Sequence, residues 1–391
     1  MRRKIFIWVI LVSLGVSCRE RFEAEGAFAE GNFLVVDGFI QVGGGVTRIE
    51  LSRVTKLNET STLQPDADSE VFIEDNAGTD YTLHNRGNGL YESDVLNLDL
   101  DAEYRLRIES RGKTYLSSYT APILTPAIDS VGWDLDSENF ITVHVNTHDL
   151  RNNTFYYKWE YEEVWEIRTA YQSKWAYENG VARARPSEEI KRMSFCWPYR
   201  YNPDLVIASS KQLTSDAIRL FPLVKFHYSD ARLGWRYSIR VTQRALSAEE
   251  YEFLQIMQKN TNDIGGFFDP QPSQLTGNMF CTTSDEPVVG YVGAYTSQQK
   301  QLIIKRDEIS DFEYTTPCFF ELINGSLEDP FFPDYLVRAL PLDPIYGPFE
   351  DDAAPIVGFI LVERTCADCR IEFGTAPKPD FWVAEDEGNV E

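Results

Sequence analysis

The stretch Glu103-Tyr-Arg-Leu-Arg-Ile-Glu109 alternates apolar and charged side chains with a period of two. In an extended chain, Tyr104, Leu106 and Ile108 lie on one face and the two arginines between them on the other. This alternation predicts a strand with one buried and one solvated face. The Arg111-Gly-Lys113 that follows is a turn signal, so a second strand is expected from residue 114.

Similar short strands precede this hairpin. Residues 32–41 and 46–54 read as strands separated by a triple glycine, and residues 70–83 read as a hairpin around Asn76-Ala-Gly78. Strands at this spacing predict a β-sandwich over residues 32–125, with an immunoglobulin-like or transthyretin-like architecture.

Prolines at 122 and 126 mark a linker to a second β region, expected to be fibronectin-III-like and to span residues 126–245. Within it, Phe155, Tyr157, Trp159 and Tyr161 share one strand face. Residues 178–193 are polar and basic, which predicts an excursion from the sheet.

The third predicted region, residues 246–391, combines a helix with β strands and loops. The helix is expected over residues 247–259, because Ser247 and Glu250 form a capping box and Leu246 and Tyr251 a hydrophobic staple. The overall fold class is therefore mainly β, with one helix and disulfide-bonded loops near the C-terminus.

The N-terminus is typical of an exported lipoprotein. Arg2, Arg3 and Lys4 precede an uncharged, mostly apolar run over residues 5–16, which is too short to span a bilayer as a helix. Gly15-Val-Ser-Cys18 then resembles a lipobox, in which the cysteine carries the lipid. We predict a signal peptide over residues 1–18, lipid attachment at Cys18 and a tether over residues 19–31.

The charge of the chain excludes some partners. The formal net charge is −24, and such a surface repels nucleic-acid phosphates. We therefore expect no nucleic-acid partner.

Five cysteines follow Cys18, and in an oxidising compartment disulfides are the default. We expect Cys366 or Cys369 to bond Cys318, or else the two to close a Cys366–Cys369 ring, and Cys196 to pair with Cys281. A redox role for Cys366-Ala-Asp-Cys369 needs a helix N-terminus to lower the thiol pKa, and residues 370–374 do not look helical.

Enzyme signatures are mostly missing from the sequence. There is no Gly-x-Ser-x-Gly, His-Glu-x-x-His, phosphate-binding loop or dinucleotide fingerprint. We expect no catalytic residues, no metal site and no cofactor. One alternative is a secreted hydrolase built from scattered carboxylates, which predicts a convergent pair of Asp or Glu with a displaced pKa.

An aromatic stretch is the expected contact element for a partner. We predict a hairpin over residues 155–177 that extends beyond its sandwich, with four aromatic residues exposed at its distal part: Trp165, Tyr171, Trp175 and Tyr177. Trp and Tyr dominate the binding energy of many protein interfaces. The alternative is that this hairpin folds onto the C-terminal region and is structural.

Several segments together resemble one family. They are Asn32–Gly38, Tyr156–Glu163, Cys196-Trp197, Leu246–Tyr251, Phe268–Asn278, Glu286–Ala294, Cys366–Arg370 and Lys378–Trp382. In this order, behind a lipid cysteine, they resemble the Bacteroidota lipoproteins catalogued as domain of unknown function 4249. Cys281 departs from that resemblance.

The resemblance implies a function in binding. It is to proteins found with TonB-dependent outer-membrane transporters, so it implies a non-catalytic accessory subunit for such a transporter or another outer-membrane barrel. The expected location is the outer membrane, lipid-anchored at the cell surface, with the periplasmic leaflet as an alternative. A structural or adhesive surface protein is the second rival to this function.

Overall fold

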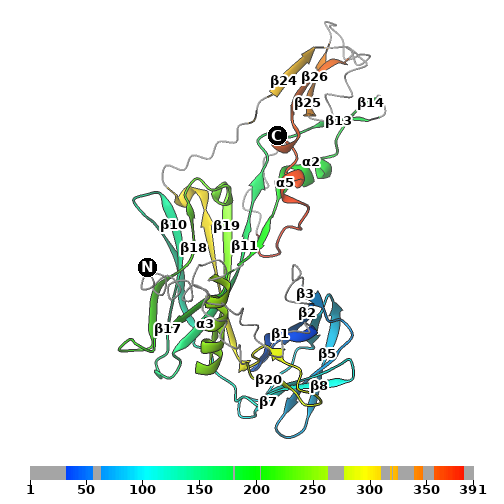
Figure 1. Cartoon of the computed structure of the whole chain (residues 1–391). Helices are drawn as coiled ribbons and strands as arrows, with labels where there is room; N and C mark the ends of the chain where they lie inside the picture. Colours follow the sequence, from blue (N-terminus) through cyan, green and yellow to red (C-terminus); the bar gives the residue numbers. More distant parts are fainter. Residues whose placement is uncertain are drawn as a thin grey trace, which may run out of the picture.

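The computed structural model describes residues 32–55, 63–178, 181–202, 204–262, 277–309, 318, 320–324, 339–346 and 356–382. The predicted signal peptide, Cys18 and the tether lie outside these residues. The described chain forms three parts: a curled N-terminal sheet, a β-sandwich and a smaller distal module that projects from the sandwich (Figure 1). The predicted mainly β architecture is confirmed, whereas the immunoglobulin-, transthyretin- and fibronectin-like topologies stay predictions.

The N-terminal sheet is built mainly from residues before 118. Its strands are β1 (Asn32–Gln41), β2 (Arg48–Thr55), β3 (Leu63–Pro65), β4 (Glu70–Asp75), β5 (Asp80–Gly87), β6 (Leu90–Ser93), β7 (Tyr104–Ser110) and β8 (Lys113–Ser117). Their order is β8-β7-β4-β5-β6-β2-β1, with β3 on β2.

The alternation that predicted β7 is the pattern of its burial. Tyr104, Leu106 and Ile108 are buried in the core, while the arginines between them face Glu74 on β4. Arg111 and Gly112 form the turn to β8, with φ angles of 53° and 74°. A two-residue turn with both central φ angles positive matches the right-handed twist of paired strands.

Three later strands complete this sheet, and they correct the predicted domain boundary at residue 246. β20 (Met279–Cys281) pairs with β8, while β21 (Val288–Val289) and β22 (Ala294–Tyr295) pair in parallel with β1. The Asn278 side chain exchanges two 2.8 Å hydrogen bonds with the backbone of Val292, which joins the two edges. Residues 277–296 therefore close the sheet around its core.

The sandwich has two sheets. One contains β9 (Ile128–Leu135), β10 (Phe140–His148) and β18 (Ala217–His227), in the order β18-β10-β9. The other contains β11 (Tyr156–Trp165), β16 (Tyr199–Tyr201), β17 (Val206–Ser209), β19 (Arg236–Ala245) and β23 (Ser297–Lys305), in the order β16-β11-β19-β23 with β17 also on β11. The short 3-10 helices η1 (Ala231–Leu233) and η2 (Arg306–Glu308) flank β19 and β23.

The aromatic face of β11 forms the centre of this sandwich. Tyr157 and Trp159 are completely buried, and the indole nitrogen of Trp159 donates a 2.8 Å hydrogen bond to Gln243. β11 pairs with β16, β17 and β19, and β13 pairs with β14, so the predicted hairpin over residues 155–177 is wrong. The inward face is occupied by core packing instead.

Helix α3 (Ala248–Asn262) confirms the predicted helix. The Glu250 amide donates to the Ser247 hydroxyl at 3.0 Å, as in a capping box, and Leu246 packs in one cluster with Tyr251. The Glu250 carboxylate instead accepts a hydrogen bond from Tyr295 of β22. The helix thus contacts both the sandwich and the strands that return to the N-terminal sheet.

The distal module combines short elements from two parts of the chain. They are β12 (Ile167–Arg168), β13 (Trp175–Glu178), β14 (Val181–Ala184), α2 (Ser187–Ser194), β15 (Phe195–Cys196), β24 (Phe320–Asn324), β25 (Ala339–Tyr346), β26 (Ile356–Glu363), η3 (Arg364–Cys366) and α5 (Arg370–Phe373). The sequence did not predict α2, and the prediction that residues 370–374 are not helical is wrong, because α5 lies there.

Candidate partner-binding site

The distal module is an excursion of the sandwich chain locked to the C-terminal segment. The chain leaves at the end of β11 and returns at β16. Within the excursion, the Thr169 amide donates to the Ser194 carbonyl at 3.0 Å. The Tyr171 amide donates to the Cys366 carbonyl at 3.1 Å, and the Ser173 hydroxyl to the Pro341 carbonyl at 2.6 Å. The two segments therefore fold as one unit.

Two disulfides staple that unit. Cys196 bonds Cys369, and Cys318 bonds Cys366. The expected bond from Cys366 or Cys369 to Cys318 is confirmed. The expected Cys196–Cys281 pair and the alternative Cys366–Cys369 ring are wrong: Cys281 lies in β20 as a free, partly exposed thiol. Loops closed over such long separations remove much conformational entropy from the unfolded chain.

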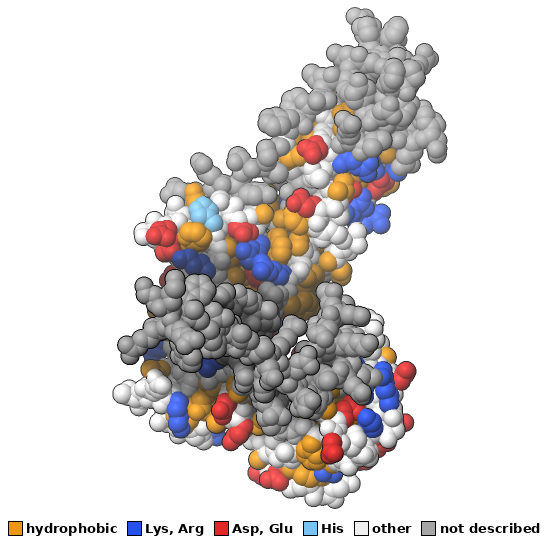
Figure 2. All heavy atoms as spheres, viewed as in Figure 1, with side chains coloured by type: hydrophobic (Ala, Val, Ile, Leu, Met, Phe, Trp, Pro, Cys, Tyr) orange, Lys and Arg blue, Asp and Glu red, His pale blue; other side chains and the backbone are white. Residues whose placement is uncertain are grey.

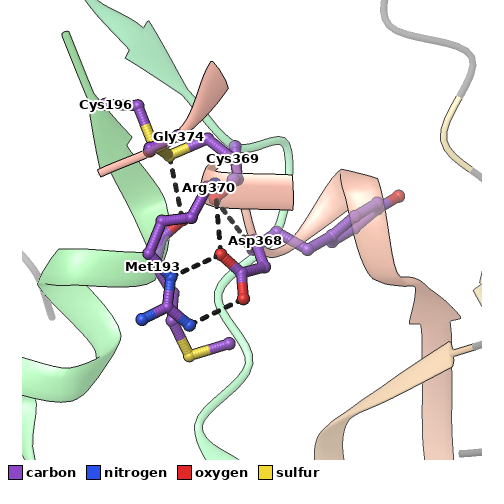
Figure 3. Close-up of a disulfide and its surroundings, with 8 residues drawn as sticks. Met193, Cys196, Asp368, Cys369, Arg370 and Gly374 are labelled. Atoms are coloured by element: carbon purple, nitrogen blue, oxygen red, sulfur yellow. Dashed lines mark hydrogen bonds and ion pairs between the residues drawn. A yellow bond between two sulfur atoms is a disulfide. The ribbon is translucent and has the colours of Figure 1, made fainter. Parts of the chain in front are cut away.

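Backbone and side-chain contacts position the Cys196–Cys369 bond, as Figure 3 shows. The Cys369 amide donates a 2.9 Å hydrogen bond to the Met193 carbonyl at the end of α2. Asp368 accepts two 2.7 Å hydrogen bonds from the Arg370 guanidinium, and this partnership raises the Arg370 pKa. The disulfide thus fixes α2 against α5.

A buried carboxylate holds the neck between the sandwich and the module. Glu166 is buried, and its oxygens accept a 2.7 Å hydrogen bond from the Trp382 indole and a 2.5 Å one from Arg168. The Arg236 guanidinium lies 5.4 Å from the centre of the Trp382 ring. The sequence does not single out Glu166, although Lys378–Trp382 is one of the segments that carry the family resemblance.

The four predicted contact residues have different surroundings. Trp165 is half-buried and packs against both the sandwich core and the Cys196–Cys369 cluster. Tyr171 is half-buried against the cluster that contains Met193 and Cys366. These two side chains therefore pack between parts of the protein, as the structural alternative predicted.

Trp175 lies in strand β13 and does not face the module's interior. Its neighbour Ala176 in β13 is buried. Successive side chains of a strand point to opposite faces. Trp175 is half-buried and therefore lies on the outward face of the β13–β14 hairpin. Tyr177 also belongs to β13, but its side chain lies outside the described residues.

Basic side chains surround this hairpin. Glu189 of α2 is paired with Arg183 at 3.0 Å and with Arg185, which lowers the Glu189 pKa. Lys174 and Arg192 are exposed. In Figure 2, Lys and Arg side chains gather with hydrophobic ones on the described part of the module. The described part of the module thus exposes basic side chains beside this hairpin, together with the acidic Glu188, Glu363 and Glu372.

Three further exposed aromatic residues lie near the neck and were not predicted. Tyr199 and Tyr201 lie in β16, an edge strand of the sandwich, and Tyr201 is 71% exposed. Trp235 is 41% exposed, with the Arg168 guanidinium 4.0 Å from its ring centre. Their alternation in Tyr199-Arg-Tyr201 was the available signal, but three residues are too few to separate an edge strand from a loop.

A hydrolase would require a convergent carboxylate pair, and Asp149 and Asp216 are two buried carboxylates on adjoining turns. Burial raises the Asp216 pKa, despite hydrogen bonds from the Ser210 hydroxyl at 2.5 Å and the Tyr157 hydroxyl at 2.9 Å. Asp149 accepts backbone amides of its own turn. These hydrogen bonds give the two carboxylates a structural role, because they tie together the turns that contain Asp149 and Asp216.

The part of the chain that the structure describes contains no group of three or more His, Cys, Asp or Glu side chains able to hold a metal ion. No helix there is long and apolar enough to cross a membrane.

Two solved structures illustrate the matches to known structures, and both likenesses are weak. A DUF4785 family protein from Legionella pneumophila is 13% identical with a TM-score of 0.18, covering 48% of this chain and 56% of that one. The adhesin InvE of Yersinia pseudotuberculosis is 12% identical with a TM-score of 0.18, covering 55% and 57%. The chain thus spans little more than half of either, and such scores do not establish a shared fold.

Sequence comparison is more specific. No curated protein matches the chain. The family model described as "Domain of unknown function (DUF4249)" matches residues 19–301, which include the N-terminal sheet, α3 and the sandwich as far as the middle of β23. Because this match covers well over half of the sequence, the protein belongs to the family described as Domain of unknown function (DUF4249).

Proposed function

We propose that the protein is a non-catalytic accessory subunit, lipid-anchored at Cys18 on the outer-membrane surface, that binds a TonB-dependent transporter or another outer-membrane barrel. The membrane location rests on the signal-like N-terminus and the cysteine that follows it. The binding role rests on the distal module.

One observation carries this proposal: a small module, stapled by two disulfides and anchored by Glu166, projects from the sandwich with a half-buried tryptophan on its outer face. A preformed surface loses little conformational entropy on binding, so more of its contact energy appears as affinity. Aromatic and arginine side chains are the usual anchors of such interfaces. The module supplies both.

Replacing Trp175 tests the contact directly. We expect Trp175→Ala to lower recovery of a co-purifying outer-membrane protein by roughly tenfold or more, because an interfacial tryptophan contributes about 2 kcal/mol or more. Recovery is measured by affinity purification from detergent-solubilised membranes followed by mass spectrometry.

The matched control is Phe280→Ala, an exposed aromatic residue of the N-terminal sheet. It should leave recovery unchanged, and both variants should melt within a few degrees of the wild type. Trp165→Ala is unsuitable, because Trp165 packs against two cores and its loss should destabilise the neck. If the wild type and Trp175→Ala recover the same amount of the partner, the module is not the contact element.

The anchor has its own test. Cys18→Ser should move the protein from the membrane fraction to the soluble fraction, because the thiol is the expected acylation site and several acyl chains on one residue anchor stably. Intact-mass spectrometry of the wild type should show the added lipid. A wild-type chain without lipid would refute the anchor, while leaving the module open to the preceding test.

A further inference from the structure

One end of the sandwich carries apolar side chains in full contact with water. Leu150, in the turn between β10 and β11, is 90% exposed, and Leu213, in the turn between β17 and β18, is 55% exposed. Leu220, on the edge strand β18, is 61% exposed. We call this end, made of residues 149–153 and 210–220, the sandwich tip. It lies at the lower left in Figure 1, whereas the distal module projects from the top of the sandwich.

The two turns of the tip are tied to each other. The Asp149 amide donates to the Asp216 carbonyl at 3.0 Å, and the Asp216 amide donates to the Asn152 side chain at 2.6 Å. The Ser210 hydroxyl donates to the Asp216 carboxylate at 2.5 Å. These contacts place the turns that carry Leu150 and Leu213 side by side.

Leu220 is held outward by an unusual backbone. Its φ is +50°, in the left-handed region that bulky residues rarely adopt. The Leu220 amide donates a 2.7 Å hydrogen bond to the Asn146 side chain. This bond lies next to an irregularity in the register of β10 and β18. A bulge of this kind re-aims a side chain, and here it directs a leucine into solvent.

The charges of the tip have one sign at its surface. Its three basic residues, Arg151, Lys211 and Arg219, are exposed. Its two acidic residues, Asp149 and Asp216, are buried. Arg151 lies 3.6 Å from the Asp149 carboxylate of its own turn, so part of its charge is offset there. The nearby Asp129 lies 2.7 Å from the His148 ring. The formal net charge of the whole chain is −24, so the basic side chains beside the exposed leucines contrast with the charge of the molecule as a whole.

We propose that the sandwich tip is a lipid-contact surface, which inserts Leu150 and Leu213 into the interfacial region of an anionic bilayer while Arg151, Lys211 and Arg219 meet its headgroups. Apolar side chains flanked by basic ones bind such interfaces through buried apolar area plus attraction to anionic lipid. A protein partner would not require that every exposed charge be positive. This surface would orient the protein on the membrane independently of the distal module.

The experiment uses residues 19–391, the chain that follows the predicted signal peptide and Cys18, so that neither an attached lipid nor the apolar run over residues 5–16 contributes. Binding is measured by sedimentation with large unilamellar vesicles. The chain should bind vesicles of phosphatidylcholine mixed with phosphatidylglycerol. It should bind phosphatidylcholine vesicles more weakly, and high salt should weaken the binding to the mixed vesicles. Leu150→Ser with Leu213→Ser should lower the partition coefficient about tenfold, because the apolar area that these side chains bury in the bilayer interface is lost. Arg151→Glu with Lys211→Glu should also lower it about tenfold.

The matched control is Val95→Ser with Leu100→Ser. Val95 and Leu100 are 78% and 42% exposed, but they lie in a segment of the N-terminal sheet that carries Asp94, Asp99 and Asp101. This pair should bind as the parent does. The proposal is overturned if the parent chain binds neither vesicle, if the tip variants bind as well as the parent, or if the control loses as much. Loss of a co-purifying protein with unchanged vesicle binding would also overturn it. Thermal melts establish that each variant is folded.

Discussion

At the scale of single residues, Glu250 has the most unusual environment. It is buried where α3, β19 and β22 meet, and it accepts a hydrogen bond from Tyr295. A guanidinium nitrogen of Arg244 lies 3.8 Å from the Glu250 carboxylate. The same guanidinium stacks 4.0 Å from the centre of the Phe39 ring. Burial is the largest influence on the Glu250 carboxyl and raises its pKa, although Arg244 opposes this.

That pKa shift predicts how stability depends on pH. The folded protein holds the Glu250 proton to a higher pH than the unfolded chain, whose ordinary value is 4.5. The stabilising contribution is therefore complete below that value and is lost as the pH rises through the folded pKa. Glu250→Gln, which stays neutral, should melt a few degrees above the wild type at about pH 8.

Thermal unfolding across the pH range measures this difference, which should shrink toward about pH 4.5. Glu249→Gln is the matched control, because Glu249 is adjacent on α3 and exposed. A gap between Glu250→Gln and wild type that stays constant with pH, or that is larger in acid, would contradict the assignment.

At the scale of elements, the sequence predicted those strands and helices whose signal lies within a few neighbouring residues. The β7–β8 hairpin, the core face of β11 and the helix α3 each have a periodic or capping signal within a few residues. α2 had acidic and basic residues at its ends but few apolar ones, so its segment read only as a polar excursion.

Pairings between segments far apart in the sequence could not be predicted in this way. β21 and β22 are two residues each, and their strand geometry comes from pairing with β1. The disulfides follow the same rule: Cys196 and Cys369 are 173 residues apart, and the contact between α2 and α5 brings them together. For the candidate site, the sequence identified Trp175 but missed Glu166, whose role exists only because Trp382 returns to it.

At the scale of the whole molecule, residues 277–305 connect the parts. The first half of this segment completes the N-terminal sheet, and β23 then joins the sandwich beside β19. Glu286 in the same segment reaches Arg53, at 3.1 Å, and Lys113 of the N-terminal sheet. The N-terminal sheet and the sandwich are therefore not independent domains.

This connection predicts the behaviour of a fragment cut at the boundary that the sequence suggests. Residues 32–125 alone lack Met279, Val288, Val292 and Ala294, which are buried in the core of the N-terminal sheet. Burying a large apolar side chain is worth roughly 1.5–3 kcal/mol, and a whole domain is stable by only about 5–15 kcal/mol. The fragment also leaves edges of β1 and β8 unpaired, which favours aggregation.

The fragment of residues 32–125 should show no cooperative melt by circular dichroism, and a fused 277–296 segment should restore one. The same fusion with Val288→Ser and Val292→Ser should not. A cooperative melt of the bare fragment near the temperature of the intact protein would show that the returning strands are dispensable.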